Sequence, residues 1–271
     1  MSRAPAPRRR RRPPPPPPIE ENALARFGLD HRQQRILTII AVAAGVIIAA
    51  VVLTYAFASL GGDVRAVQSD SGSGVGQDRP SAYQGWASTK VFAPIAKREA
   101  DTRPLTAKEV FGGKTLKAGK ITLKLAGSTL DQSCAAAVWG TPLVDLLNAG
   151  ECAQAVRGIY TSADNRYVAQ YTLFNLRDTE AADTLVRELE TKHRAGWALA
   201  LTSGRAALPA DGHTEASGHA MGHYAGLVWI ARKDGAEPEK GDDLVTLSLA
   251  VRGAEKAVYR RIVAASATPT Q

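Results

Sequence analysis

Three of the five histidines lie close together in the sequence, at His213, His219 and His223. Imidazole nitrogens and carboxylate oxygens are common ligands of zinc and copper, and further donor side chains lie nearby at Asp211, Glu215 and Met221. The glycine-rich stretch 203–222 is typical of a solvated surface loop, which does not fix a coordination geometry. We therefore expect no bound metal or cofactor here. A metal-binding sensor or metal-dependent enzyme built on residues 211–223 is the alternative.

Other groups that could act in catalysis have simpler explanations. Asp178, Glu180 and Asp183 fall at the start of a predicted helix, where negative charge complements the helix dipole. Arg157 follows on a predicted strand, where it would bind an anionic group or, more simply, cover an apolar edge with its stem. The sequence has no G-x-S-x-G, P-loop or G-x-G-x-x-G motif. We therefore expect no catalysis.

A long uncharged segment runs from Ile36 to Leu60. Its 25 residues would form a helix of roughly 37 Å, against about 30 Å for the hydrocarbon core of a bilayer. We therefore predict a single transmembrane helix over residues 36–60. A cleaved signal peptide is the competing interpretation, because Ala56 and Ala58 form an A-x-A-like site before Ser59.

The segment before the predicted span is strongly basic. Residues 1–35 hold nine arginines, no lysine and three acidic residues, a net charge of +6 out of +8 for the whole chain. Basic residues are retained on the cytoplasmic side of a span, so we predict a cytoplasmic N-terminus and an extracytoplasmic C-terminal part at the cell membrane. The remaining +2 gives that exported part no strong reason to bind nucleic acid.

Two low-complexity runs dominate this tail. Six prolines at 13–18 follow a run of five arginines, Arg8, Arg9, Arg10, Arg11 and Arg12. Prolines exclude helix and favour polyproline II, and clustered arginines repel one another. We therefore expect a disordered tail whose simplest role is to set topology. Attraction to anionic lipid, or docking to a partner that accepts PxxP, are alternative roles.

The chain has two cysteines, Cys134 and Cys152, and both lie outside the cytoplasm in the predicted topology. An even number of cysteines in an oxidising compartment favours a disulfide bond. Two separate buried thiols are the alternative. A bridge would join the two ends of a predicted helical segment.

The remaining chain divides into a linker and one domain. Residues 61–104 are a predicted flexible linker, with a Gly/Ser-rich coil at 69–81. Residues 105–266 form the predicted extracytoplasmic domain, and residues 267–271 are expected to fray. Trp86 in the linker is a candidate contact residue, whereas three tryptophans are expected in the core: Trp139, Trp197 and Trp229.

Periodicity within the domain predicts both strands and helices. We expect helices at 105–111, 141–149, 178–194 and 255–263, and strands at 121–125, 156–161, 167–173, 197–201, 224–232 and 245–251. Short turns between neighbouring strands favour antiparallel pairing. The predicted fold is therefore α+β, an antiparallel sheet with helices on one face and a possible ferredoxin-like arrangement in its second half.

Several segments also carry a resemblance. They are LTAKEVF at 105–111, the pair Cys134 and Cys152 followed by Arg157 and Tyr160, and RYVAQYTLFNLRDTEAAD at 166–183. In these features the chain resembles uncharacterised single-pass membrane proteins of the actinobacterial cell envelope. The resemblance implies an envelope location and a disulfide, and it supplies no functional site. The resulting hypothesis is a membrane-anchored domain that binds another envelope component, protein or polymer.

Overall fold

The computed structural model describes residues 65–66, 79–204 and 206–267. The predicted transmembrane segment at 36–60, the basic tail with Arg8 to Arg12 and the proline run lie outside these residues. No helix within the described part of the chain is long and apolar enough to cross a membrane. The predicted span therefore stays a prediction.

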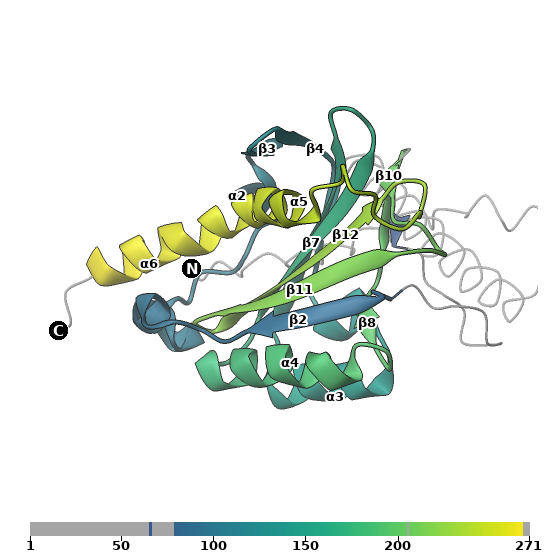
Figure 1. Cartoon of the computed structure of the whole chain (residues 1–271). Helices are drawn as coiled ribbons and strands as arrows, with labels where there is room; N and C mark the ends of the chain where they lie inside the picture. Colours follow the sequence, from purple (N-terminus) through teal and green to yellow (C-terminus); the bar gives the residue numbers. More distant parts are fainter. Residues whose placement is uncertain (1–64, 67–78, 205, 268–271) are drawn as a thin grey trace, which may run out of the picture. The chain divides into compact units, whose positions relative to one another are not determined.

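A seven-stranded sheet forms the centre of the domain (Figure 1). In spatial order its strands are β2 (Ala82–Trp86), β11 (Thr214–Met221), β12 (Tyr224–Arg232), β7 (Tyr167–Asn175), β6 (Gln154–Ser162), β4 (Ile121–Asp131) and β3 (Thr115–Ala118). Every neighbouring pair is antiparallel except β2 and β11, which are parallel. The expected α+β class and the predicted hairpin of β6 and β7 are confirmed.

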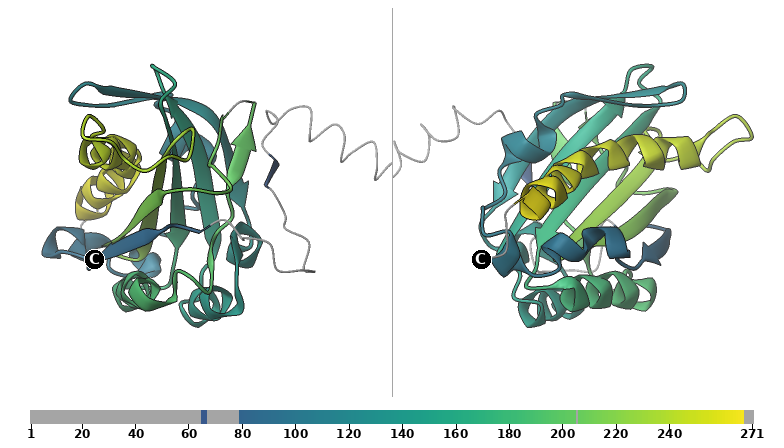
Figure 2. Two further views of the ribbon diagram at one scale, coloured as in Figure 1. Left: turned by 45° about the vertical axis from the view of Figure 1, so that its right-hand side comes forward. Right: turned by 90° about the vertical axis from the view of Figure 1, so that its left-hand side faces the viewer.

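Helices cover both faces of this sheet, so the expectation that they cover one face is wrong (Figure 1 and Figure 2). One face packs against α3 (Thr141–Ala149) and α4 (Thr179–Lys192), and the other against α2 (Ala107–Phe111), α5 (Leu244–Val251) and α6 (Lys256–Ala267). On β6, Ala155 and Ile159 belong to the first core and Val156 and Tyr160 to the second. Alternate residues of the central strands are thus buried on opposite sides.

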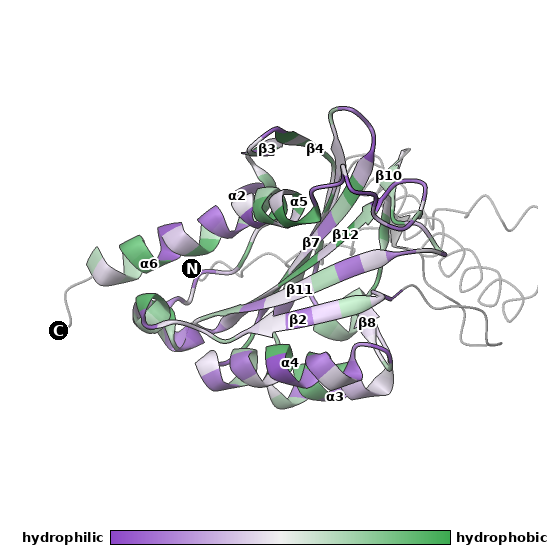
Figure 3. Ribbon diagram, in the orientation of Figure 1, coloured by the Kyte–Doolittle hydropathy of each residue, from purple (hydrophilic) through white to green (hydrophobic). Residues whose placement is uncertain are grey.

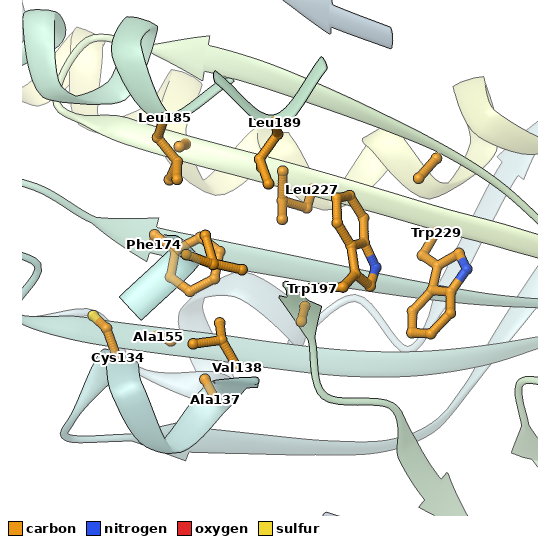
Figure 4. Close-up of a cluster of buried hydrophobic side chains, with 14 of the residues drawn as sticks. Cys134, Ala137, Val138, Ala155, Phe174, Leu185, Leu189, Trp197, Leu227 and Trp229 are labelled. Atoms are coloured by element: carbon orange, nitrogen blue, oxygen red, sulfur yellow. The ribbon is translucent and has the colours of Figure 1, made fainter. Parts of the chain in front are cut away.

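The first core, between the sheet and the α3–α4 layer, is centred on two tryptophans. Trp197 and Trp229 are buried and meet edge to face, with ring centroids 6.2 Å apart. Figure 4 shows Leu185 and Leu189 of α4 beside Leu227 of β12 in the same cluster. Trp197 and Trp229 therefore lie where the sequence predicts, while Trp139 packs at the edge of this core, partly buried.

The predicted disulfide is confirmed between Cys134 and Cys152. It joins the short 3-10 helix η4 (Cys134–Ala137) to the residues that follow α3. In between lies β5 (Val138–Trp139), which pairs with β8 (Trp197–Ala198). The bridge therefore holds the α3 segment against the edge of the first core, which includes Cys134.

Two helices begin with a side-chain cap. Thr106 Oγ1 accepts a hydrogen bond from the Glu109 N–H at 3.1 Å, and Asp178 Oδ1 accepts one from the Ala181 N–H at 2.9 Å. These contacts satisfy amides that have no partner within the helix. At α3 Gly140 precedes the helix with a positive φ of 89°, and no side chain caps it.

The segment 244–251 is a helix, α5, and the predicted strand at 245–251 is wrong. Its buried residues, Leu247, Ala250 and Val251, have helical spacing. Asp243 Oδ1 accepts a hydrogen bond from the Thr246 N–H at 2.9 Å and so starts the helix. Figure 3 shows α5 as largely hydrophobic, although part of it is exposed.

The predicted glycine-rich loop at 203–222 is also wrong. Three strands occupy much of it: the end of β9 (Leu201–Ser203), β10 (Ala206–Ala207) and β11. β9 pairs with both β10 and β1 (Arg65–Ala66) in a small sheet. β11 has strands on both sides, and Gly218 leaves room there for the Tyr83 ring of β2.

The predicted linker at 61–104 is wrong over residues 79–104, which are part of the folded domain. β2 adds the parallel edge strand, and two short 3-10 helices follow it, η2 (Lys90–Ile95) and η3 (Arg98–Ala100). The Tyr83 hydroxyl donates to the Val186 carbonyl of α4 at 3.0 Å, and Asp183 accepts the Ser88 N–H at 2.7 Å. These contacts fix the segment against α4.

The second half contains one unit of the expected ferredoxin-like arrangement. Strands β7 and β11 are parallel, are connected through α4, and enclose β12 between them. A ferredoxin-like fold has two such split units. Here no described strand follows β12, and α5 and α6 lie on the face opposite α4, so the second unit is not formed by the described residues.

Candidate functional site

A groove of about 470 Å³ opens between the sheet and α5. Its floor comes from β2, β11 and β12, and its wall from α5 and the residue after it. The lining residues are Ala82, Tyr83, Gln84, Trp86, Glu215, Ala216, Ser217, His219, Val228, Ile230, Leu244, Val245, Ser248, Leu249 and Arg252. The groove therefore lies along the open edge of the sheet.

The floor is arranged by the period of the strands. On β11, Glu215, Ser217 and His219 alternate and so share one face. The parallel register places Gln84 of β2 beside Ser217 and Trp86 beside His219. A row of polar side chains thus crosses the floor, next to an edge strand.

Ser217, His219 and Glu255 form a connected polar cluster at this floor, and each is no more than 6% exposed. His219 Nε2 lies 3.1 Å from Ser217 Oγ, and His219 Nδ1 lies 3.1 Å from Glu255 Oε1. The first contact is a hydrogen bond. The second is an electrostatic contact, because its geometry does not make a hydrogen bond. Glu255 belongs to η5 (Arg252–Glu255), which follows α5.

Arg252 holds the Glu255 carboxylate from the other side. Its guanidinium donates to both carboxylate oxygens, with distances of 3.0, 3.2 and 3.2 Å. The carboxylate is therefore fixed in orientation between a guanidinium and an imidazole.

The rim of the groove is apolar and exposed. Trp86 is 46% exposed, Val245 74% and Leu249 53%. The Trp86 ring meets the His219 ring edge to face, with centroids 4.9 Å apart. An entering ligand would therefore meet aliphatic and aromatic groups first and the imidazole and hydroxyl groups deeper in.

The structure does not bring the three candidate histidines together. His213 precedes β11 and contacts Glu215 at 3.0 Å and Glu237 at 2.8 Å. His219 lies six residues further on, about 20 Å away at the ~3.3 Å rise of a strand. Within the described residues, no group of three or more His, Cys, Asp or Glu side chains could hold a metal ion. The alternative of a shared metal site in one loop is thus unsupported.

His223 has a structural position rather than a place in the groove. It is fully buried, and its Nδ1 donates to the Ile95 carbonyl at 2.8 Å. Burial lowers the pKa of His223, because the imidazolium loses its contact with water, and the Ile95 hydrogen bond offsets this only in part. The neutral ring therefore links the turn between β11 and β12 to η2.

Arg157 is neither an anion-binding residue on the surface nor a cover for an apolar edge. It is buried, and its guanidinium donates to both Asp131 oxygens at 2.8 and 3.0 Å. A third hydrogen bond, at 3.0 Å, goes to the Leu199 carbonyl. Gln170 donates to the same carbonyl at 3.0 Å, so both side chains hold the segment that leads into β9.

Sequence reasoning missed the cluster around Ser217 for two reasons. The glycine content of 203–222 predicted a loop where β11 lies, and a loop does not place Ser217 and His219 on one face. Glu255 is 36 residues beyond His219, and only the fold brings it close. The alternation Glu215, Ser217, His219 was the available signal.

Comparison with known proteins supplies no relative for this site. No protein-family model matches the chain, and neither a curated protein nor a solved structure is significantly similar to it. Any function must therefore be argued from the residues themselves.

Proposed function

We propose that this chain is a membrane-anchored binding protein of the cell envelope, whose α+β domain lies outside the cytoplasm. The apolar segment from Ile36 to Leu60 and the arginine-rich tail before it support a single span with a cytoplasmic N-terminus. The disulfide between Cys134 and Cys152 supports an oxidising compartment for the domain.

One observation carries the choice of binding surface. Three of the large apolar side chains that are exposed in the described domain, Trp86, Val245 and Leu249, line the same groove. Exposed apolar groups that gather around a concavity with a few polar groups at its floor are typical of a binding site. The proposed partner is an envelope protein or polymer that inserts an apolar group between β2 and α5.

Cross-linking in intact cells tests this proposal. The full chain carries a C-terminal tag, and captured partners are identified by mass spectrometry. We expect a repeatable partner outside the membrane, whose capture is lost in Val245→Asp. Val263→Asp is the matched control, because Val263 is 70% exposed on α6 and does not line the groove.

Two outcomes would contradict the proposal. Capture of cytoplasmic proteins alone would overturn the orientation. Equal loss of the partner in the Val245 and Val263 variants would show that the groove has no special role.

A further inference from the structure

Ser217, His219 and Glu255 are connected in the order that nucleophilic catalysis requires. The imidazole contacts the hydroxyl through Nε2 and the carboxylate through Nδ1, both at 3.1 Å. The Nδ1 contact is electrostatic and makes no hydrogen bond, but the negative charge beside Nδ1 favours the neutral tautomer that carries its proton there, which leaves Nε2 free to accept a proton. The Ser217 hydroxyl then donates to Nε2, as an activated serine does.

Two members of the cluster also face the groove. Ser217 and His219 both line it, while Glu255 and Arg252 approach from the η5 side. A structural hydrogen bond alone would explain a serine and histidine in a closed core. Here the two groups instead lie at the floor of a cavity of about 470 Å³ with an apolar rim.

Stabilisation of an oxyanion must come from side chains in this site. β11 has a strand on each side, so its backbone N–H groups serve the sheet. Gln84 is exposed, lines the groove and pairs in register with Ser217 across the β2–β11 ladder. Its amide N–H is therefore a candidate donor, and side-chain amides are known to fill this role.

We propose that Ser217 is a nucleophile that His219 activates and Glu255 positions, and that the groove takes an ester with an apolar acyl chain. Ser217 Oγ attacks the carbonyl carbon while its proton passes to His219 Nε2. The C–O bond to the alcohol then breaks, and the alcohol oxygen takes that proton. Water next attacks the acyl-serine and gives a proton to His219, and the released serine oxygen recovers it. The products are a carboxylic acid and an alcohol.

This inference goes beyond the proposed binding function and does not depend on it. It also opposes the sequence-based expectation of no catalysis, which rested on the lack of a nucleophile motif. Ser217 lies in the middle of β11, whereas the G-x-S-x-G motif describes a serine at a strand-to-helix turn. A search for that motif therefore does not find Ser217.

Covalent labelling of the purified full-length protein provides the test. A fluorophosphonate probe with an alkyl chain loses fluoride when a serine oxygen attacks phosphorus. We expect one adduct, on Ser217, and none in Ser217→Ala. Ser266→Ala is the control, since Ser266 is exposed on α6 and does not line the groove, and it should label as the wild type does.

The roles of the other two residues need separate measurements. His219→Asn should slow labelling by about 10²- to 10⁴-fold, the usual contribution of a general base. Glu255→Gln should slow labelling of the folded protein, because the uncharged amide no longer positions the His219 ring, and Glu255→Asp, which keeps the charge, should restore part of the rate. A purely structural Glu255 would lower the thermal stability in both variants and leave the labelling rate of the folded protein unchanged.

Three results would overturn the proposal. They are no labelling of the folded wild type above the level of heat-unfolded protein, labelling that persists in Ser217→Ala, and no hydrolysis of nitrophenyl esters of any acyl length from two to twelve carbons. Since the probe needs no envelope partner, these results are independent of the cross-linking test.

Discussion

Removing the disulfide should cost the domain about 3 kcal/mol of unfolding free energy. The bridge joins residues 18 apart in the sequence, and the loop-closure relation gives roughly 3 kcal/mol at 25 °C for a loop of this size. A domain of this length loses about 2–4 °C of melting temperature per kcal/mol. We therefore expect the melting temperature of Cys134→Ala/Cys152→Ala to fall by about 6–12 °C.

Urea unfolding followed by circular dichroism measures this cost, and reduced wild-type protein supplies the control. Both forms lack the cross-link, but only the double variant lacks the two sulfur atoms. Equal free energies of unfolding for the reduced wild type and the double variant would assign the lost stability to the chain entropy of the unfolded state. A loss below about 1 kcal/mol in both would refute the argument from loop length. A much larger loss in the double variant alone would indicate that packing of Cys134 dominates.

Three further predictions concern buried groups. His223→Asn keeps a donor to Ile95 but cannot ionise. Because the pKa of His223 is lowered on folding, the melting temperature of the wild type should fall relative to that of the variant as the pH drops below about 6.5. Parallel curves of melting temperature against pH for the two proteins would contradict this. Arg157→Ala leaves Asp131 without its buried partner and should cost about 3–5 kcal/mol in urea unfolding; a cost below about 1 kcal/mol would refute the role of the pair. Leu247→Ala should lower the free energy of unfolding by about 2–5 kcal/mol, because Leu247 is buried. Val245→Ala should lower it by less than about 0.5 kcal/mol, because Val245 is exposed. Similar losses in the two variants would favour a strand in place of α5.

Local patterns predicted those parts of the fold whose stabilising contacts are themselves local. The β6–β7 hairpin needs only a short turn and two strands of suitable composition. Helix α4 carries its own cap at Asp178 and a single apolar face. The disulfide followed from the number of cysteines and the predicted compartment. In each case the determinants are close in sequence or independent of topology.

The wrong strand prediction at 245–251 arose because a strand period and a helix period both fit the same residues. The sequence of 244–251 alternates apolar and polar side chains, but it also places Leu247, Ala250 and Val251 on one helical face. Eight residues are too few to separate the two periods. Asp243, in capping position, was the local sign that favoured the helix.

Partners distant in the sequence account for the remaining differences. β11 is rich in small residues, which leave room for the strands and side chains that pack on both sides of it. The same composition is typical of a loop, and so it led to the wrong prediction. The candidate site could not be predicted for a similar reason. Glu255 is far from His219 in the sequence and contacts it only because η5 packs against the sheet.

The edge strand β2 also sets an order of events during synthesis. Ser81, which directly precedes β2, accepts a hydrogen bond from the Thr214 N–H of β11 across a separation of 133 residues. At a synthesis rate of about 5–20 residues per second, β2 waits roughly 7–27 s for its partner strand. During that interval Trp86 has no groove to line and the sheet lacks its edge. The first strand of the main sheet to be made is therefore among the last to pair, and a chaperone acting on this domain would find its longest-lived target there.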